Sequence, residues 1–253
     1  MNDDSTMRTV LVTGGGRGIG AGASWVCSQQ GWAVAVNYAS DRTAADRVVD
    51  RILATGGRAK AFQCDVSDEA QVLRLFEEVD RDLPPLGGLV NNAGVVDLAS
   101  RVDEMSAERL QRMFAINVFG SFFCAREAIK RLSTRHGGNG GAIVNLSSAA
   151  AKLGAPGQYV DYAAAKGAID SFTLGLAREL AGEGIRVNAV RPGIIDTDIH
   201  ASGGQPDRVG QMAPQVPMKR AGTADEVGEA IAWLLSDASS YTTGAIIDVT
   251  GGR

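Results

Sequence analysis

The stretch TVLVTGGGRGIG, residues 9–20, joins an apolar run to a cluster of glycines. The apolar run Thr9–Thr13 predicts a buried strand, and the residues that follow the glycines predict the start of a helix. Side chains in such a turn would keep a phosphate away from the backbone, whereas glycines let it reach the N–H groups at the helix start. The stretch therefore predicts a strand–turn–helix unit that binds the diphosphate of a dinucleotide. The residues expected to form this site are Gly14, Gly16, Arg17, Gly18, Ile19 and Gly20.

Short apolar runs alternate with amphipathic segments along the rest of the chain. Continuous apolar runs suit strands buried on both faces, as in a parallel sheet covered by helices. The predicted strands are Thr9–Thr13, Ala33–Asn37, Ala59–Cys64, Gly88–Asn91, Ala142–Leu146, Arg186–Val190 and Ala245–Val249. The predicted helices include Ala44–Thr55, a long helix within Glu104–Arg135, and Tyr159–Ala181. This alternation predicts an α/β fold, a single Rossmann-type doubly wound domain with about seven parallel strands and helices on both faces.

No segment has the composition of a linker between domains. We therefore expect residues 8–253 to form one domain after a disordered tail at residues 1–7. One stretch, Asp196–Arg220, has no regular pattern and contains three prolines. A long irregular segment inside a compact domain is usually functional or disordered. Its position relative to the other motifs favours a mobile substrate lid over a surface insertion.

The overall composition is that of an ordinary globular protein, with 45% hydrophobic and 21% charged residues. The 25 Lys and Arg residues against 29 Asp and Glu give a net charge of -4, and the basic residues are scattered, which argues against nucleic-acid binding. The three cysteines lie far apart and the two histidines are isolated, so no metal site is expected. No signal-peptide pattern and no membrane-length apolar run is present, which predicts a cytoplasmic protein with no membrane partner.

A second motif, Tyr162 and Lys166 with three alanines between them, lies in the predicted helix Tyr159–Ala181. The spacing of four places both side chains on one helical face. A free phenol has a pKa of about 10, too high for a general base at neutral pH, and a nearby ammonium would lower that pKa. The pair therefore suits proton transfer to a carbonyl oxygen or from an alcohol. By spacing alone, a surface pairing of Tyr with Lys is the commoner arrangement.

Two serines, Ser147 and Ser148, follow the predicted strand Ala142–Leu146. They would lie at the carboxyl edge of the sheet, where open α/β proteins bind their ligands. A hydroxyl group at this edge could donate a hydrogen bond to a substrate oxygen, or it could cap a turn. This feature alone does not separate the two roles.

Together these motifs resemble the short-chain dehydrogenase/reductase family, and the resemblance extends from about Thr9 to Gly252. The motifs occur in the family's order, which makes the set far more specific than any one of them. They are Thr13–Gly20, Asp65, Asn91–Gly94, Asn117, Ser148, Tyr162 with Lys166, and Pro192-Gly193. The resemblance implies an oxidoreductase that transfers a hydride between nicotinamide and a small ketone or secondary alcohol. It also implies a homotetramer built on the two long helices.

The resemblance further implies a role for each residue. Tyr162 would be the catalytic acid/base, and Lys166 would lower its pKa and hold the nicotinamide ribose. Ser148 would orient the substrate carbonyl, and Asn117 would anchor a water that joins Lys166 to solvent. Thirteen residues separate Ser148 from Tyr162, one more than the commonest family spacing, so Ser147 stays an alternative to Ser148. The remaining implied cofactor contacts are Asp65 and Val66 near the adenine, Asn92, Ala93 and Gly94 beside the adenine ribose, and Pro192, Gly193, Ile195 and Thr197 at the nicotinamide end.

The end of the second predicted strand bears on the choice of cofactor. An acidic residue there would bind the 2′-hydroxyl of NAD and repel the 2′-phosphate of NADP. The residues present, Asn37, Tyr38 and Ser40, are uncharged, and we expect them to lie beside the adenine ribose. Arg17 in the glycine turn could meet the charge of the phosphate. The sequence therefore favours NADP(H) and leaves NAD(H) possible.

Two substrate classes remain open, a 3-oxoacyl thioester and a sugar or polyol, because GAPGQYVDYAAAK at residues 154–166 is similar to both subgroups. An acyl carrier protein would prefer a basic entrance to the site. Arg208, Lys219 and Arg220 could form one, but three basic residues are few for this purpose. An alternative of another class is a non-catalytic protein that senses the cofactor. Such a regulator is expected to lack the Tyr or the Lys of the second motif, and this chain has both.

Overall fold

The computed structural model describes residues 7–253, so the expected disordered tail at residues 1–7 lies outside the described part except for its last residue. Seven parallel strands form one sheet in the order β3-β2-β1-β4-β5-β6-β7. The strands are β1 (Thr9–Val12), β2 (Ala33–Tyr38), β3 (Ala59–Gln63), β4 (Leu86–Asn91), β5 (Gly141–Leu146), β6 (Ile185–Pro192) and β7 (Ile246–Val249). Each of them overlaps one predicted run. The predicted doubly wound α/β fold is therefore confirmed.

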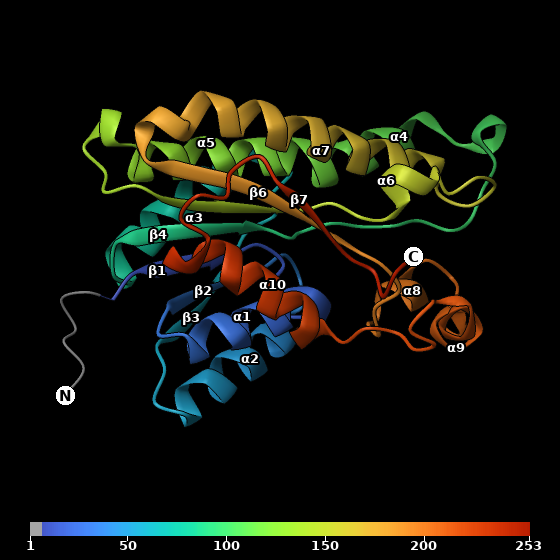
Figure 1. The fold of residues 1–253 in the computed structure, drawn as a ribbon, viewed down its shortest axis with the longest axis horizontal. Coiled ribbons are helices and arrows are strands. Elements are labelled where there is room, and N and C mark those ends of the chain that lie inside the picture. Colours follow the sequence, from blue (N-terminus) through green and yellow to red (C-terminus); the bar gives the residue numbers. More distant parts are fainter. Residues whose placement is uncertain (1–6) are drawn as a thin grey trace.

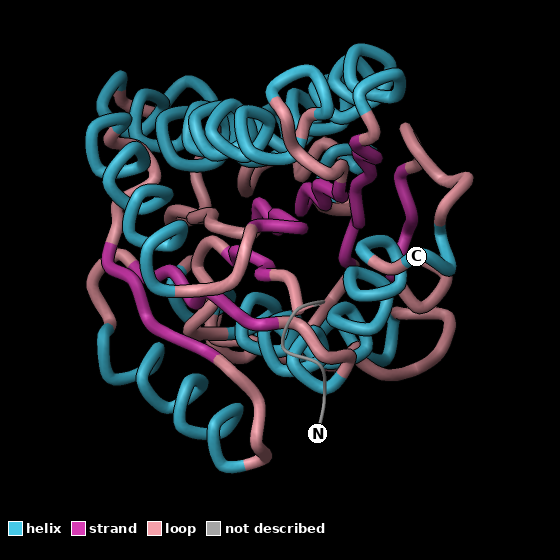
Figure 2. Tube along the Cα trace, turned by 90° about the vertical axis from the view of Figure 1, so that its left-hand side faces the viewer, coloured by secondary structure: helices cyan, strands magenta, loops and turns pink. Residues whose placement is uncertain are grey.

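Helices cover both faces of this sheet (Figure 1). One layer contains α1 (Gly18–Gln29), α2 (Arg42–Ala54) and α10 (Ala224–Leu235). The other contains α3 (Glu69–Asp82), α4 (Ala107–Phe114), α5 (Gly120–Leu132) and α7 (Val160–Leu180). Figure 2 shows the strands enclosed between the two layers. Each layer closes its own apolar core, with Ile52 and Ile231 on the first side and Phe76 and Leu132 on the second.

Local capping explains where two of these helices begin. The Asp68 side chain accepts hydrogen bonds from the N–H groups of Ala70 and Gln71 at 2.9 and 3.2 Å, so α3 starts at Glu69. At the start of α10, Thr223 and Glu226 form a reciprocal capping box. Both arrangements satisfy N–H groups that the first turn of a helix leaves without partners.

The long helix expected within Glu104–Arg135 is present as α4 and α5, which a π-helical segment, Ala115–Phe119, joins end to end. Such widened turns inside α-helices are frequent at functional sites. Asn117 lies in this segment and is fully buried. The π-helical segment thus directs a polar side chain into the interior of the domain.

The stretch 196–220, expected to be irregular, contains two short helices, α8 (Ile199–Ser202) and α9 (Arg208–Met212). Helices of four and five residues are too short to produce a readable periodicity in the sequence. In Figure 1 both lie beyond the carboxyl end of the sheet, close to the last residues of the chain. A third short helix, α6 (Ala150–Leu153), follows β5 on the same side.

Candidate active site

The turn between β1 and α1 packs so closely that several positions require glycine. Gly14 and Gly18 have φ angles of +62° and +49°, in the left-handed region. A Cβ atom on Gly20 would lie 2.2 Å from the carbonyl oxygen of Gly14. Within the described part of the chain, no side chain caps the first turn of α1. Its N–H groups therefore stay available to an anion, and the turn fits the diphosphate of a dinucleotide.

Asn37, expected to contact the cofactor, instead lies behind this turn. Its Oδ1 accepts a hydrogen bond from the N–H group of Gly14 at 3.1 Å. Its Nδ2 donates to the carbonyl oxygens of Phe62 and Cys64 at 3.3 and 3.0 Å, and the side chain is buried. The amide therefore ties the glycine turn to β3. Ser40, further along, is exposed, as are Arg17 and Asp65, while Tyr38 is partly buried.

The loop after β4 supports the other side of the turn. Asn92 Nδ2 donates to the carbonyl oxygens of Thr13 and Gly14 at 2.8 and 3.2 Å. The hydroxyl oxygen of Thr13 accepts from the N–H groups of Asn92 and Ala93 at 2.9 and 3.0 Å. These contacts hold Asn92 and Ala93 against the backbone that would face the dinucleotide.

Val66, expected to contact the adenine, is buried, and its side chain occupies the space that a Cβ on Gly120 would need.

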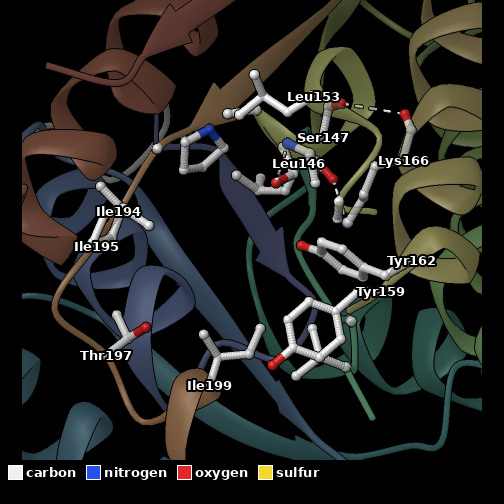
Figure 3. Close-up of a pocket in the computed structure, with 18 of the residues that line it drawn as sticks. Leu146, Ser147, Leu153, Tyr159, Tyr162, Lys166, Ile194, Ile195, Thr197 and Ile199 are labelled. Atoms are coloured by element: carbon white, nitrogen blue, oxygen red, sulfur yellow. Dashed lines mark hydrogen bonds between the residues drawn. The ribbon is translucent and has the colours of Figure 1, made fainter. Parts of the chain in front are cut away.

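A cavity of about 440 Å³ lies at the carboxyl end of the sheet, between α7 and the 196–220 segment (Figure 3). The predicted residues that line it are Ile19, Asn92, Gly94, Ser148, Tyr162, Lys166, Pro192, Gly193, Ile195 and Thr197. Those that do not are Gly14, Gly16, Arg17, Gly18, Gly20, Asn37, Tyr38, Ser40, Asp65, Val66, Ala93 and Asn117. The glycine turn nevertheless adjoins the cavity, because a Cβ on Gly18 would lie 3.3 Å from the side chain of Thr197.

The hydroxyl group of Tyr162 points into this cavity from α7 (Figure 3). A hydrogen bond with Ser148 places that serine next to the phenol. Ser147 differs, because its buried Oγ donates to the carbonyl oxygen of Lys166 at 3.3 Å. The geometry therefore favours Ser148 over Ser147 as the hydroxyl group beside the reacting oxygen.

The buried side chain of Lys166 does not touch the phenolic oxygen. Its Nζ donates to the carbonyl oxygen of Leu146 at 2.6 Å and lies 5.6 Å from the centre of the Tyr162 ring. Burial lowers the pKa of Lys166 to about 8, and the carboxylate of Asp170 opposes that change. Burial raises the pKa of Tyr162 to about 12, against the effect of its hydrogen bond with Ser148. Burial sets the raised pKa and Lys166 is not among its causes, so the expectation that the ammonium lowers the phenol's pKa stays a prediction.

Asn117 fixes the backbone of the loop after β4. Its Oδ1 accepts from the N–H group of Val95 at 3.1 Å, and its Nδ2 donates to the carbonyl oxygens of Val95 and Met113, both at 3.0 Å. A Cβ on Gly94 would lie 2.6 Å from Asn117 Oδ1 and 3.6 Å from Lys166 Nζ. The amide of Asn117 thus lies close to Lys166, with only Gly94 between them. Its role as the anchor of a water stays a prediction.

Sequence reasoning missed several charged residues near the cavity. Asp170 accepts from Arg191 at 2.7 Å, and its other carboxylate oxygen is buried without a hydrogen-bond partner. Its position four residues after Lys166 on a predicted helix was a readable signal. Arg208 and Arg253 also line the cavity; the sequence indicated Arg208 as a basic residue of a possible entrance, whereas nothing in it indicated Arg253. Their positions depend on how the end of the chain and the 196–220 segment fold back over the sheet.

The described residues, 7–253, lack two kinds of feature. In that range, no three His, Cys, Asp or Glu side chains come together in a way that could hold a metal ion. None of the helices in the same range is both long enough and apolar enough to cross a membrane.

Comparison with known proteins adds independent information. A family model described as enoyl-(acyl carrier protein) reductase matches residues 14–253. The uncharacterized oxidoreductase YgfF of Escherichia coli (strain K12) is 52% identical over 247 residues, which cover 98% of this chain and all of that protein. The chain belongs to the short-chain dehydrogenase/reductase family. It is therefore an oxidoreductase, of a family that binds NAD or NADP.

Other short-chain dehydrogenases/reductases match over similar lengths. Glucose 1-dehydrogenase 2 of Bacillus subtilis (strain 168) is 34% identical, with 100% of this chain and 96% of that protein covered. The crystal structure of a blue fluorescent protein from a metagenomic library in complex with NADPH has a TM-score of 0.87 and 34% identity, and covers 97% of both chains. The family is thus shared along the whole chain, while the relatives differ in what their names say they do.

Proposed function

We propose that this protein catalyses reversible hydride transfer between NADP(H) and a small ketone or secondary alcohol, with Tyr162 as the acid/base. The observation that carries the proposal is the convergence of Tyr162, Ser148 and Lys166 on one cavity that adjoins the glycine turn. When bound, the nicotinamide supplies or accepts the hydride. The protein residues supply orientation and the proton.

Each side chain has a distinct part in this proposal. Ser148 donates a hydrogen bond to the substrate oxygen and so turns it toward Tyr162. Because burial raises the pKa of Tyr162 to about 12, the phenol is protonated at neutral pH and can donate its proton to a carbonyl oxygen. Lys166 lies one helical turn from Tyr162, where its ammonium stabilises the negative charge left on the phenol oxygen.

The preference for NADP(H) rests on the exposed groups near the end of β2. Ser40 and Arg17 are exposed, and no acidic residue takes the place of Asn37, Tyr38 or Ser40. Arg17, at the N-cap of α1, can bind the 2′-phosphate. The NADPH bound in a structural relative with 34% identity supports the same choice.

The test combines a substrate screen with one substitution. A panel of ketones, sugars and oxoacyl thioesters is followed by the absorbance of NADPH, and the most active compound is then used with the variant Tyr162→Phe. We expect the variant to bind NADPH as the wild type does, while turnover falls by about 10²–10⁴-fold. Undiminished turnover in this variant would remove Tyr162 from the mechanism, and a protein that does not bind either nicotinamide cofactor would refute the whole proposal.

We further propose that the protein is a cytoplasmic homo-oligomer that assembles on its long helices. Phe119 and Phe122, along the α4–α5 helix, are 52% and 46% exposed, and Leu174 on α7 is 40% exposed. The ring of Phe122 stacks on Phe172 with 3.9 Å between centroids, which joins these apolar groups across α5 and α7. Light scattering after gel filtration should give the mass of a tetramer, and Phe122→Glu should lower it. A monomeric mass for the wild type would contradict the proposed homo-oligomer.

A further inference from the structure

The charged side chains that line the cavity are all cationic. They are Lys166, Arg208 and Arg253, and no Asp or Glu is among the described residues that line it. The chain as a whole carries a net charge of -4, so the cavity differs in sign from the protein around it. A cleft lined by one sign of charge concentrates ions of the opposite sign. Lys166 belongs to the proposed mechanism, whereas that mechanism makes no use of Arg208.

Arg208 begins α9 and extends to the start of α7. Its Nη1 donates to Oε1 of Gln158 at 2.9 Å and to Oε1 of Gln205. Its Cζ lies 5.6 Å from the centre of the Tyr159 ring. Both hydrogen-bond partners are neutral amides, and no carboxylate of the described residues forms an ion pair with Arg208. Its charge is therefore not neutralised, and its planar group matches the geometry of a carboxylate or a phosphate.

The other basic residues of the 196–220 segment are engaged elsewhere. Arg220 donates to both carboxylate oxygens of Glu226, at 2.8 and 2.6 Å. Lys219 Nζ donates to the carbonyl oxygen of Pro214 at 3.2 Å. Neither residue lines the cavity. Among the side chains of this segment that the structure describes, Arg208 is thus the cation that lines the cavity.

Apolar side chains also line the cavity. Tyr159 lies three residues before Tyr162 and lines the same cavity, and its ring faces the guanidinium of Arg208. Side chains three residues apart on a helix are about 5–6 Å apart at Cβ. Further apolar side chains come from the loop after β4, from α6 and from the 196–220 segment. They are Val96, Leu153, Ile199 and Met212.

We propose that Arg208 is the anion-binding residue of the substrate site. The substrate it selects is an apolar ketone, or the corresponding alcohol, that also carries a carboxylate or phosphate. The inference rests on the proposed function and adds the chemical class of the substrate.

The test compares probes that share an acetophenone ring and differ in the group at its para position, which is anionic or neutral. The probes are 4-acetylbenzoate, 4-acetylphenyl phosphate and the neutral 4′-methylacetophenone, and their binding to the NADP-saturated protein is measured by calorimetry. We expect at least tenfold tighter binding of one anionic probe than of the neutral one. The tighter of the two anions identifies the group as carboxylate or phosphate. Turnover with NADPH is measured on the same probes.

Substitutions assign that preference to one residue. Arg208→Met should weaken binding of the preferred anion at least tenfold and change binding of the neutral probe less than twofold, while Arg208→Lys should keep part of the preference. Arg220→Met is the matched control, because it removes an arginine of the same segment that does not line the cavity, and it should behave as the wild type.

Two outcomes would overturn the assignment of Arg208. One is equal binding of neutral and anionic probes by the wild type, and the other is an equal loss for both kinds of probe in Arg208→Met, which would indicate a general defect of the 196–220 segment. Failure of the proposed function looks different. The protein would then reduce no carbonyl compound of either charge, while the binding data would still decide the role of Arg208.

Discussion

Asp161, the residue immediately before Tyr162, is held by Arg109 through two hydrogen bonds, 2.8 Å from Nε to Oδ2 and 3.3 Å from Nη2 to Oδ1. The carboxylate of Asp161 is completely buried. Arg109 also donates from Nη1 to the carbonyl oxygen of Leu98 at 2.7 Å. One guanidinium therefore connects α4, the loop after β4 and the first turn of α7. This makes Arg109 a positioning residue for the phenol.

Replacing Arg109 by Met should damage both stability and turnover. A buried carboxylate that loses its partner costs about 3–5 kcal/mol of folding free energy. We expect a lower melting temperature, and a kcat that falls more than KM rises, because the helix start that carries Tyr162 loses its anchor. Circular dichroism and steady-state kinetics measure the two effects.

The matched control is Arg112→Gln, because Arg112 lies on the same helix and pairs with Asp97 at the surface, at 3.4 Å. An exposed pair contributes about 0–1 kcal/mol, so this variant should resemble the wild type. The double variant Arg109→Met with Asp161→Asn also removes the buried carboxylate charge that Arg109→Met leaves without a partner, and it should recover part of the stability. An unchanged melting temperature in Arg109→Met alone would show that the pair does not anchor α7.

The pH dependence of reduction should report Lys166. Since its pKa is lowered to about 8, the ammonium is lost as the pH rises through that value, and kcat/KM should fall there. The Asp170 carboxylate favours the ammonium, and Arg191 pairs with that carboxylate at 2.7 Å. Asp170→Asn removes the carboxylate that favours the ammonium of Lys166, while Arg191 keeps its other partner, Asp248, at 3.6 Å, so the fall in kcat/KM should move to lower pH.

The comparison for this experiment is Asp46→Asn, an exposed carboxylate on α2 that should leave the profile unchanged. Tyr162, with its pKa raised to about 12, does not titrate near pH 8, where the fall in kcat/KM is expected. A shift of the Asp170→Asn profile to higher pH would contradict the assignment of this limb to Lys166.

Cofactor preference should depend on Arg17. The side chain is exposed at the N-cap of α1, where it can meet a 2′-phosphate. We expect Arg17→Ala to raise KM for NADPH about tenfold or more and to change KM for NADH less than threefold, because NADH lacks that phosphate. Arg42→Ala, whose arginine already pairs with Asp46 at 3.3 Å, should have a smaller effect. Equal changes with both cofactors would argue against the phosphate contact.

Arg186 should contribute to stability without contributing to catalysis. Its Nη1 and Nη2 donate to the carbonyl oxygens of Leu234 and Ser236 at 2.8 and 3.0 Å, where α10 ends. These bonds satisfy carbonyl groups that the last turn of a helix leaves without partners. Arg186→Met should cost about 2 kcal/mol, a fall of roughly 4–8 °C in melting temperature. Arg47→Met, on an exposed position of α2, provides the control, and an equal melting temperature for both variants would refute the role.

The sequence was most informative where a pattern is local. Apolar runs located every strand to within two residues, and the four-residue spacing of Tyr162 and Lys166 placed both on one helix. Even the start of α10 was readable from Thr223 and Glu226, although that helix was not predicted.

The sequence was least informative where the outcome depends on contacts between distant segments. The local sequence around Asn37 does not indicate that its side chain is buried. Its hydrogen bonds between the glycine turn and β3 depend on how the strands pair. The pKa of Tyr162 depends on how completely the folded chain surrounds it, and spacing on a helix does not reveal that. Likewise, Arg208 reaches the cavity because the 196–220 segment folds over α7, which no short motif encodes.

We expect the π-helical segment Ala115–Phe119 to support turnover at the expense of thermal stability. π-Helical turns are rare inside α-helices and frequent at functional sites, so we expect a shorter, regular version to withstand heat better. That version would also turn the amide of Asn117 away from Val95 and from the neighbourhood of Lys166. Engineering for heat tolerance alone would therefore tend to erase this turn, and engineering for turnover would keep it.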